Sequence, residues 1–301
     1  MISGPMHRAA FLCLLAGGCA IAFAPIFVRL SDTGPLASAF WRTALAVPIL
    51  WIWLFNTGDR PGLSRSPPRD DSGSVPRKDF VALALAGLFF AADLGVWHFS
   101  IFFTSVANST LLANLAPIFV TLAGWLFWKR RVTRTFLVGM FVAIAGMFVL
   151  VGPSFAAGGL KLLGDALGAL TGVFYAGYML AIKSARDSQA STARLMAWST
   201  TITAIVLLPL ALLAPQPFWP AAAAGWLPLL GLALVSQVLG QGLIAFAFAH
   251  LPASLSSVSL LIQPVVAALA AWIIFAEPGG PLQFLGGAIV LAGIWLSKKG
   301  S

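Results

Sequence analysis

Charged residues are scarce in this sequence, at 9% of 301 positions, whereas a soluble domain carries about 25%. So few charges cannot cover the surface of a water-soluble protein. Apolar residues make up 59% of the chain and fall into stretches of roughly 18–24 residues between short polar segments. About 20 apolar residues cross the ~30 Å hydrocarbon layer of a bilayer as a helix. The composition therefore predicts an all-α polytopic membrane protein.

Groups that hold metals or perform catalysis are equally rare. The two cysteines, Cys13 and Cys19, lie about 240° apart around one helix, which excludes a disulfide between them and gives no metal site. The three histidines are scattered, at His7, His98 and His250. The sequence also lacks a Gly-x-Ser-x-Gly element and paired intramembrane acids, so we expect neither enzyme activity nor a cofactor.

A phosphate-binding loop of the Gly-x4-Gly-Lys-Ser/Thr type is absent, which argues against transport driven by ATP. The net charge of +9 would suggest nucleic acid as the partner of a soluble protein. Here the basic residues lie between apolar stretches, where they orient a membrane protein. We therefore expect a small molecule and the lipid bilayer as partners, without nucleic acid or ATP. The oligomeric state stays open, with a monomer as the simplest arrangement.

One apolar unit occurs twice in the chain, offset by 147 residues without a gap. The pairs that align at this offset include Phe99 and Phe246, Pro117 and Pro264, Trp125 and Trp272, Gly139 and Gly286, and Gly146 and Gly293. Self-similarity over half the chain length indicates two related helical halves. We expect them to comprise residues 1–152 and 153–301.

The apolar stretches predict ten transmembrane helices, five in each half. They lie at about 9–28, 36–55, 80–103, 108–128, 135–151, 163–182, 195–214, 226–248, 254–275 and 282–296. Residues 6–24 imitate a signal peptide, but Pro25 directly after the cleavage-like site indicates a retained helix. Because five is odd, the second half must enter the membrane with the opposite orientation. The sequence therefore predicts two inverted-topology five-helix repeats, an arrangement typical of transporters that work by alternating access.

The basic residues predict how this bundle is oriented. Fifteen Lys and Arg lie on the side that would hold both termini, whereas Arg29 and Lys161 lie on the other and Arg42 within a helix. The positive-inside rule then places both termini in the cytoplasm. We expect a multi-pass protein of a bacterial inner, or plasma, membrane.

The motifs resemble those of the drug/metabolite transporter superfamily, in particular its ten-helix exporters built from two EamA-type units. The resemblance covers nearly the whole chain. It rests on Arg42 early in the second helix, on Pro117 and Pro264, on the Gly-spaced helices at 135–151 and 282–296, and on the segment 276–278. Members of this family often carry a second glutamate after the fourth helix as well as after the ninth. This chain has Glu277 after the ninth helix but Arg130 at the other position.

The resemblance implies a secondary exporter of small metabolites, and we expect amino acids, either aromatic or of broad specificity. Other metabolites or drugs are the alternative within the superfamily. A channel or a membrane-embedded enzyme is the alternative from another class.

Three candidate residues lie on the third predicted helix. Asp93 is an acid in the middle of an apolar helix, where a charge costs roughly 2.5–3.5 kcal/mol, so it should face the interior or a wet cavity. It would bind a substrate ammonium or a proton, or else only hold helices together. Trp97 lies one turn further on nearly the same face, whereas His98 points elsewhere and either relays protons or is satisfied by a neighbouring helix.

Further candidates lie on other helices. Tyr175 and Tyr178 form an aromatic stripe, and Gln237 and Gln241 lie one turn apart; each pair lines a cavity or only packs helices together. Arg42 binds a substrate carboxylate, pairs with an acid or reaches the nearby interface.

Two prolines are candidate hinges. Pro117 and Pro264 each free a backbone carbonyl within a helix and permit a bend there.

Overall fold

The computed structural model of the chain describes residues 4–57, 77–100, 102–104, 106–129, 131–151, 160–188, 190–276 and 280–301. These residues form helices, and none of them forms a strand, so the predicted all-α class is confirmed. Most of the polar stretch between the second and third predicted helices, residues 152–159 between the two halves, Arg130 and Glu277 lie outside the described residues.

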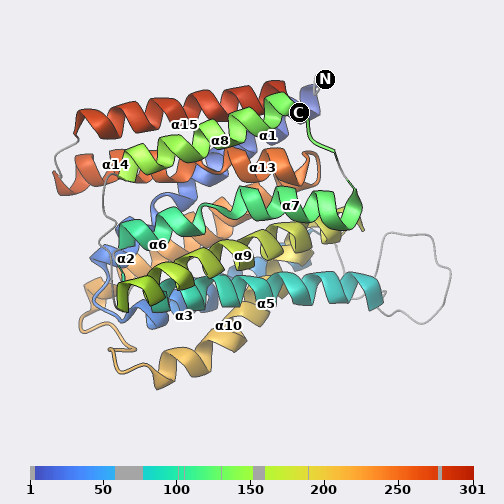
Figure 1. Cartoon of the computed structure of the whole chain (residues 1–301). Coiled ribbons are helices and arrows are strands. Elements are labelled where there is room, and N and C mark those ends of the chain that lie inside the picture. The colour runs from blue at the N-terminus through green and yellow to red at the C-terminus, as the bar shows by residue number, and fades with distance from the viewer. Residues whose placement is uncertain are drawn as a thin grey trace, which may run out of the picture.

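The helices of the first half are α1 (Pro5–Ile21), α2 (Ala24–Leu30), α3 (Pro35–Ala44), α4 (Ala46–Asn56), α5 (Arg77–Ser100), α6 (Val106–Ala113), α7 (Ala116–Trp128) and α8 (Arg134–Val151). Those of the second half are α9 (Leu160–Asp187), α10 (Thr192–Leu213), η1 (Ala223–Gly225), α11 (Trp226–Gly231), η2 (Leu232–Gln241), α12 (Gly242–Phe248), α13 (Ala253–Ser259), α14 (Ile262–Phe275) and α15 (Pro281–Lys299). They run roughly along one common direction, and the two chain termini lie at the same end of the bundle (Figure 1).

Nine segments of the described chain are long and apolar enough to cross a membrane. A shorter apolar helix, Arg134–Leu150, lies where the fifth of the ten expected spans was predicted. The count of ten therefore stays a prediction.

Several expected spans consist of two helices rather than one. The span predicted at 108–128 is α6 and α7, interrupted at Asn114–Leu115, and the one at 254–275 is α13 and α14, interrupted at Leu260–Leu261. Each interruption comes shortly before a proline, because the ring removes a hydrogen-bond donor and clashes with the carbonyl group four residues earlier, that of Ala113 or Leu260. The spans predicted at 9–28 and 36–55 as single helices are also interrupted, at Ala22–Phe23 and at Leu45.

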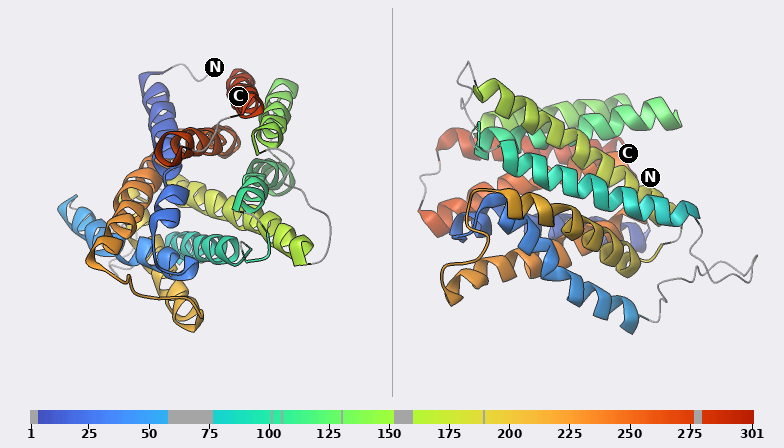
Figure 2. Two further views of the ribbon diagram at one scale, coloured as in Figure 1. Left: turned by 90° about the vertical axis from the view of Figure 1, so that its left-hand side faces the viewer. Right: turned by 90° about the horizontal axis from the view of Figure 1, so that it is seen from below.

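Glycines bring α8 and α15 together in an antiparallel pair at the edge of the bundle (Figures 1 and 2). A methyl group at Gly146 would lie 2.6 Å from the backbone nitrogen of Val290, and one at Gly286 would lie 2.6 Å from Cα of Leu150. The contacts along the pair join Gly139 to Ser297, Gly293 to Ala143, Gly146 to Val290, and Gly286 to Leu150. The 147-residue offset exchanges the members of these contacts, because 139 becomes 286 while 150 becomes 297. The two helices therefore use the same surface against each other.

The first helix of each half packs on the other half. Gly18 of α1 lies against Leu260 and Ile262, at the interruption between α13 and α14. Gly172 of α9 lies against the carbonyl oxygen of Ala113, at the interruption between α6 and α7. Positions 113 and 260 differ by 147 residues and Gly18 and Gly172 by 154, so the two contacts correspond when the first helix of each half is aligned with a shift of seven residues.

The C-terminal ends of α7 and α14 share an unusual backbone conformation. Lys129 and Ala276 are the two non-glycine residues with positive φ in the described chain, at 51° and 52°. They too are 147 positions apart. A left-handed residue ends a helix, and glycine usually occupies that position. The repeat thus preserves the conformation although glycine occurs in neither copy.

Candidate functional site

A cavity of about 130 Å³ lies within the bundle, between helices of both halves. Its polar lining consists of Arg42, Asp93, Thr110, Asn114, Thr171, Tyr175, Gln241 and Gln263. Its apolar lining includes Phe90, Trp97, Pro264 and Ala267. The cavity therefore gathers side chains that lie more than 200 positions apart in the sequence.

Asp93 lies on the cavity wall without a protein partner. The α5 helix places it among apolar residues, and only 8% of its surface is exposed. It makes no hydrogen bond and no ion pair with any residue that the structure describes. Burying an ionised carboxylate is costly unless it is paired, so this side chain has an unused capacity to bind a cation or a proton.

Arg42 brings the opposite charge to the same cavity. It extends from α3, is 7% exposed, and donates through Nε to Oε1 of Gln237 over 3.1 Å. Its guanidinium carbon lies 5.5 Å from the centre of the Phe90 ring, a cation–π contact. Within the described chain its terminal nitrogens make no hydrogen bond, so they are available to a ligand. Arg42 and Asp93 interact through space but do not form an ion pair.

Aromatic rings form one side of the site. Tyr178 stacks on Phe90 with 4.5 Å between ring centroids, and Tyr175 continues the stack at 6.3 Å. The Tyr178 hydroxyl donates to Oε1 of Gln241 over 3.3 Å, and Nε2 of Gln263 donates to the Tyr175 hydroxyl over 3.4 Å. Tyr175 lines the cavity directly, whereas Tyr178 lies behind it and supports the ring stack and Gln241.

The two predicted glutamines lie on an unusual helix. Residues 232–241 wind as a π-helix, a rare conformation that often occurs at functional sites. Gln237 receives the hydrogen bond of Arg42 and donates through Nε2 to Thr200 over 3.1 Å. Gln241 lies on the cavity wall. Gln237 thus positions Arg42, while Gln241 is placed to meet a ligand.

The neighbouring side chains of Trp97 and His98 contact each other edge to face but have different surroundings. Trp97 lines the cavity, whereas His98 is 2% exposed and does not line it. Its Nδ1 lies 2.6 Å from the carbonyl oxygen of Leu94, and its Nε2 is buried without a hydrogen-bond partner in the described chain. The two candidate hinges differ in the same way, since Pro264 lines the cavity and Pro117 does not.

Sequence reasoning missed Phe90 and Thr110. Phe90 is one of 23 phenylalanines, and nothing in its neighbourhood distinguishes it from a packing residue. Thr110 has a buried hydroxyl with no hydrogen-bond partner among the described residues, but threonine is common in membrane helices and carries no signal by itself. Asn114 and Gln263 come shortly before the two candidate hinges, where helix packing and substrate contact are both possible roles, and both line the cavity.

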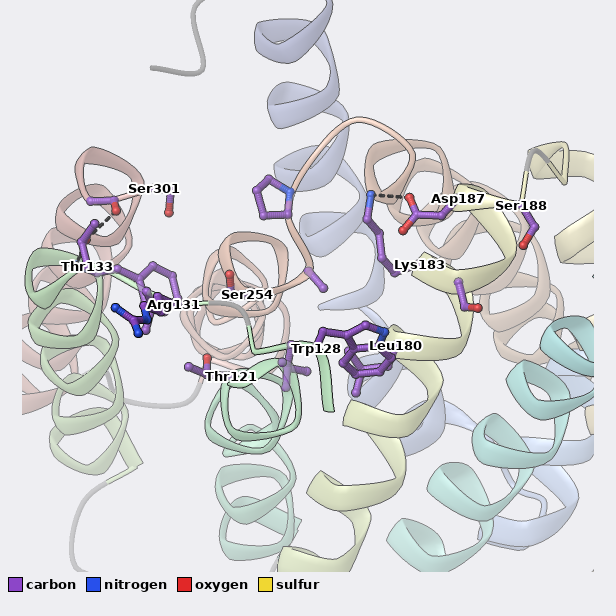
Figure 3. A pocket seen from close by; sticks show the side chains of 18 residues that line it. Thr121, Trp128, Arg131, Thr133, Leu180, Lys183, Asp187, Ser188, Ser254 and Ser301 are labelled. Carbon is purple, nitrogen blue, oxygen red and sulfur yellow. Dashed lines mark hydrogen bonds and ion pairs between the residues drawn. The ribbon is translucent and has the colours of Figure 1, made fainter. Parts of the chain in front are cut away.

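A second, larger hollow of about 720 Å³ opens at the end of the bundle that holds the termini. Its lining includes Trp128, Lys183, Asp187, Ser254 and Ser301, and Figure 3 shows these side chains around it. None of the ten site residues predicted from the sequence lines this hollow. We therefore place the candidate site in the smaller cavity, where the unpaired charges are.

Long apolar helices around a buried polar cavity define a multi-pass membrane protein. The model of the EamA-like transporter family matches residues 8–152 and again residues 162–298. The chain therefore belongs to the EamA-like transporter family, which confirms the resemblance found in the sequence.

Two relatives of this chain are named as exporters. The chain is 28% identical to the pseudopaline exporter CntI of Pseudomonas aeruginosa over 280 residues, covering 90% of this chain and 89% of that protein. It is 29% identical over 195 residues to a protein of Streptantibioticus cattleyicolor named "Probable terminal-alkyne amino-acid exporter", covering 64% of each. A solved crystal structure superimposes over 97% of both chains with a TM-score of 0.80, and at 15% identity it shows the fold alone.

Proposed function

We propose that this protein is a secondary exporter of amino acids, or of metabolites with the same pair of opposite charges, and that it works by alternating access. One observation carries the proposal: Asp93 and Arg42 face the same cavity, and neither charge is neutralised by the other in an ion pair. A zwitterion supplies an ammonium for Asp93 and a carboxylate for Arg42. The terminal nitrogens of Arg42 suit a carboxylate because the guanidinium fork matches it with two parallel hydrogen bonds.

The rings around the charges bear on the side chain of the substrate. Phe90, Tyr175 and Trp97 offer flat apolar surface next to Arg42 and Asp93. Such surface suits an aromatic or apolar side chain and also tolerates different shapes, because stacking requires no specific donor or acceptor. The two relatives, a pseudopaline exporter and a probable terminal-alkyne amino-acid exporter, support a small metabolite as the cargo. Other metabolites or drugs are the second candidate.

We propose that the transporter consists of ten spans in two inverted repeats, residues 1–152 and 153–301. The antiparallel contact of α8 with α15 supports this, because equivalent helices that run in opposite directions must belong to units of opposite orientation. The equivalent contacts of Gly18 and Gly172 and the two separate family matches support it as well. Bends at the interruptions before Pro117 and Pro264 would let the halves rock.

The excess of Lys and Arg at the end of the bundle that holds the termini supports a cytoplasmic location for both termini. The membrane would be the bacterial inner membrane. In this orientation the 720 Å³ hollow opens to the cytoplasm, the side from which an exporter takes its substrate.

Binding of charge-deleted analogues tests the proposal. Purified protein in detergent is titrated with radiolabelled L-phenylalanine in competition with unlabelled L-phenylalanine, its N-acetyl derivative and its amide. We expect L-phenylalanine to compete at least tenfold better than either derivative, because each derivative leaves one buried charge without a partner. Equal competition by all three compounds would contradict recognition of a zwitterion. No specific binding of radiolabelled L-phenylalanine would favour the alternative of other metabolites or drugs.

A further inference from the structure

At the end of the bundle opposite the termini, a cation covers an aromatic ring. Arg29, at the end of α2, places its guanidinium carbon 4.2 Å from the centre of the Phe275 ring, at the end of α14. Arg29 belongs to the first half and Phe275 to the second, so this contact joins the two halves. Both residues lie at the ends of helices that also line the central cavity.

The repeat places a corresponding pair at the other end of the bundle. Phe275 corresponds to Trp128 at the offset of 147. For the first helix of each half the offset is 154, which aligns Gly18 with Gly172 and Ala22 with Ala176. The equivalent contacts that Gly18 and Gly172 make with the interrupted helices agree with this alignment. At the same offset, Arg29 corresponds to Lys183.

The second pair is apart in this structure. Lys183 and Trp128 both line the 720 Å³ hollow, and 53% of the Trp128 side chain is exposed. The Lys183 ammonium lies 2.9 Å from Oδ1 of Asp187 and donates to the carbonyl oxygen of Phe248 over 3.1 Å. Figure 3 shows Lys183 directed at Asp187. One end of the bundle thus has a closed cation–ring pair, and the other has an open hollow between the equivalent residues.

We propose that these two pairs are alternating gates. Arg29 on Phe275 closes the side opposite the termini in the state seen here, and Lys183 on Trp128 closes the other side when the first pair separates. Asp187 holds Lys183 in the open arrangement. The inference rests on the proposed function, since it assumes that the halves rock about a central site.

A cation–ring contact suits a gate of this kind. Its strength is modest at exposed sites, so it biases a two-state equilibrium without locking it. The two contacts cannot form together if the halves move as rigid units, because closing one end opens the other. In this structure the Arg29–Phe275 pair is in contact at one end, while the hollow with Lys183 and Trp128 is open at the other, as alternating gates require.

Accessibility of the central cavity from each side tests the gates without a substrate. The background variant replaces Cys13 and Cys19 by alanine and carries Ala267→Cys, a cavity position two turns before Phe275 in α14. A membrane-impermeant maleimide is added to right-side-out or to inside-out vesicles, which expose opposite ends of the bundle. The rate of labelling at position 267 is then measured for each gate variant.

We expect Arg29→Ala and Phe275→Ala each to raise labelling from the end opposite the termini about two- to fivefold, the shift that corresponds to losing one exposed cation–π contact. Asp187→Asn should act in the same direction, because it releases Lys183 to close the other side. Trp128→Ala should lower that labelling. Arg29→Lys, which keeps a cation over the ring, should restore the background rate.

Matched controls separate gating from general loosening. Lys161→Ala removes an exposed cation at the same end as Arg29, and Phe127→Ala removes an exposed ring next to Trp128; both should leave the rate unchanged. Unchanged labelling in Arg29→Ala and Phe275→Ala would overturn the proposal, and so would a rise in all variants including Trp128→Ala. The labelling assay uses no substrate, so its result does not depend on amino-acid transport. The expected labelling pattern in a protein that transports no amino acid would support the gates and contradict the proposed function.

Discussion

Asp93 of α5 and Arg42 of α3 line the same cavity without forming an ion pair. Within the described chain Arg42 donates one hydrogen bond, to Gln237, and Asp93 makes none. A membrane helix holds unpaired charges of this kind at a cost of several kcal/mol, on the order of 2.5–3.5 per residue. Structural packing would be served better by an ion pair between them. Their separation leaves room for a ligand that carries both charges.

Removing the charge of Asp93 should impair transport. We expect Asp93→Asn to insert normally but to lower the transport rate about ten- to hundredfold, since a hydrogen bond to a charged group contributes about 1.5–3 kcal/mol. The measurement is uptake per mole of reconstituted protein. Asp32→Asn, at an exposed acid outside the cavity, is the control and should transport normally. Normal transport by Asp93→Asn would leave Asp93 a structural residue.

Arg42 should determine recognition of the carboxylate. In Arg42→Gln, affinity for L-phenylalanine should fall at least tenfold, because the fork of donors that meets the carboxylate is lost. Affinity for phenylalanine amide, which has no carboxylate, should change less than threefold. Competition binding measures both values. An equal loss for the two ligands would show that Arg42 supports the fold and does not select the carboxylate.

The contact between α8 and α15 should tolerate no side chain. Gly146→Leu forces a side chain against the backbone of Val290, and overpacking of this kind costs about 1–3 kcal/mol. The melting temperature in detergent should fall by several degrees. Gly124→Ala in α7 is the matched control, because a methyl group there meets nothing within 4 Å. Alanine also favours the helix by up to about 1 kcal/mol, so the control should melt at the same temperature or higher.

The proposed orientation predicts which segments each compartment reaches. Green fluorescent protein fused after Ser301 should fluoresce, because it folds in the cytoplasm. Alkaline phosphatase inserted after Pro217, in the segment between α10 and η1, should be active, because it requires export. An inactive phosphatase at Pro217 combined with a dark fusion at Ser301 would reverse the topology.

Much of the fold could be predicted because hydrophobic length decides where helices lie in a membrane. The span predicted at 226–248 begins and ends at those residues in the structure, as α11, η2 and α12. The prolines at 117 and 264 predicted bends, and the helices are interrupted just before them. Pro25 carried the same signal but was considered only as evidence against cleavage, so the interruption at Ala22–Phe23 was missed. The π-helix at 232–241 could not be predicted, because hydrophobic periodicity does not distinguish it from an α-helix over this length.

Site residues could be predicted from the sequence where their polarity differs from that of the surrounding helix. Asp93 and Arg42 stand out because charges are rare in apolar helices, and both line the cavity. Phe90 and Thr110 do not contrast with their neighbours, and the sequence gives no reason to select them. The bond between Arg42 and Gln237 joins positions 195 apart, a relationship that depends on how the two halves pack and that no local pattern contains.

Counterflow by purified protein shows whether this protein moves amino acids and whether Asp93 takes part. Proteoliposomes loaded with unlabelled L-phenylalanine are placed in trace radiolabelled L-phenylalanine, and counterflow is followed with and without an imposed pH gradient, with Asp93→Asn as the matched variant. We expect transient accumulation of label by the unaltered protein and at least a tenfold slower signal in the variant. Dependence on the gradient would add proton coupling to the role of Asp93. No accumulation of any amino acid, in protein shown to be folded, would contradict the account.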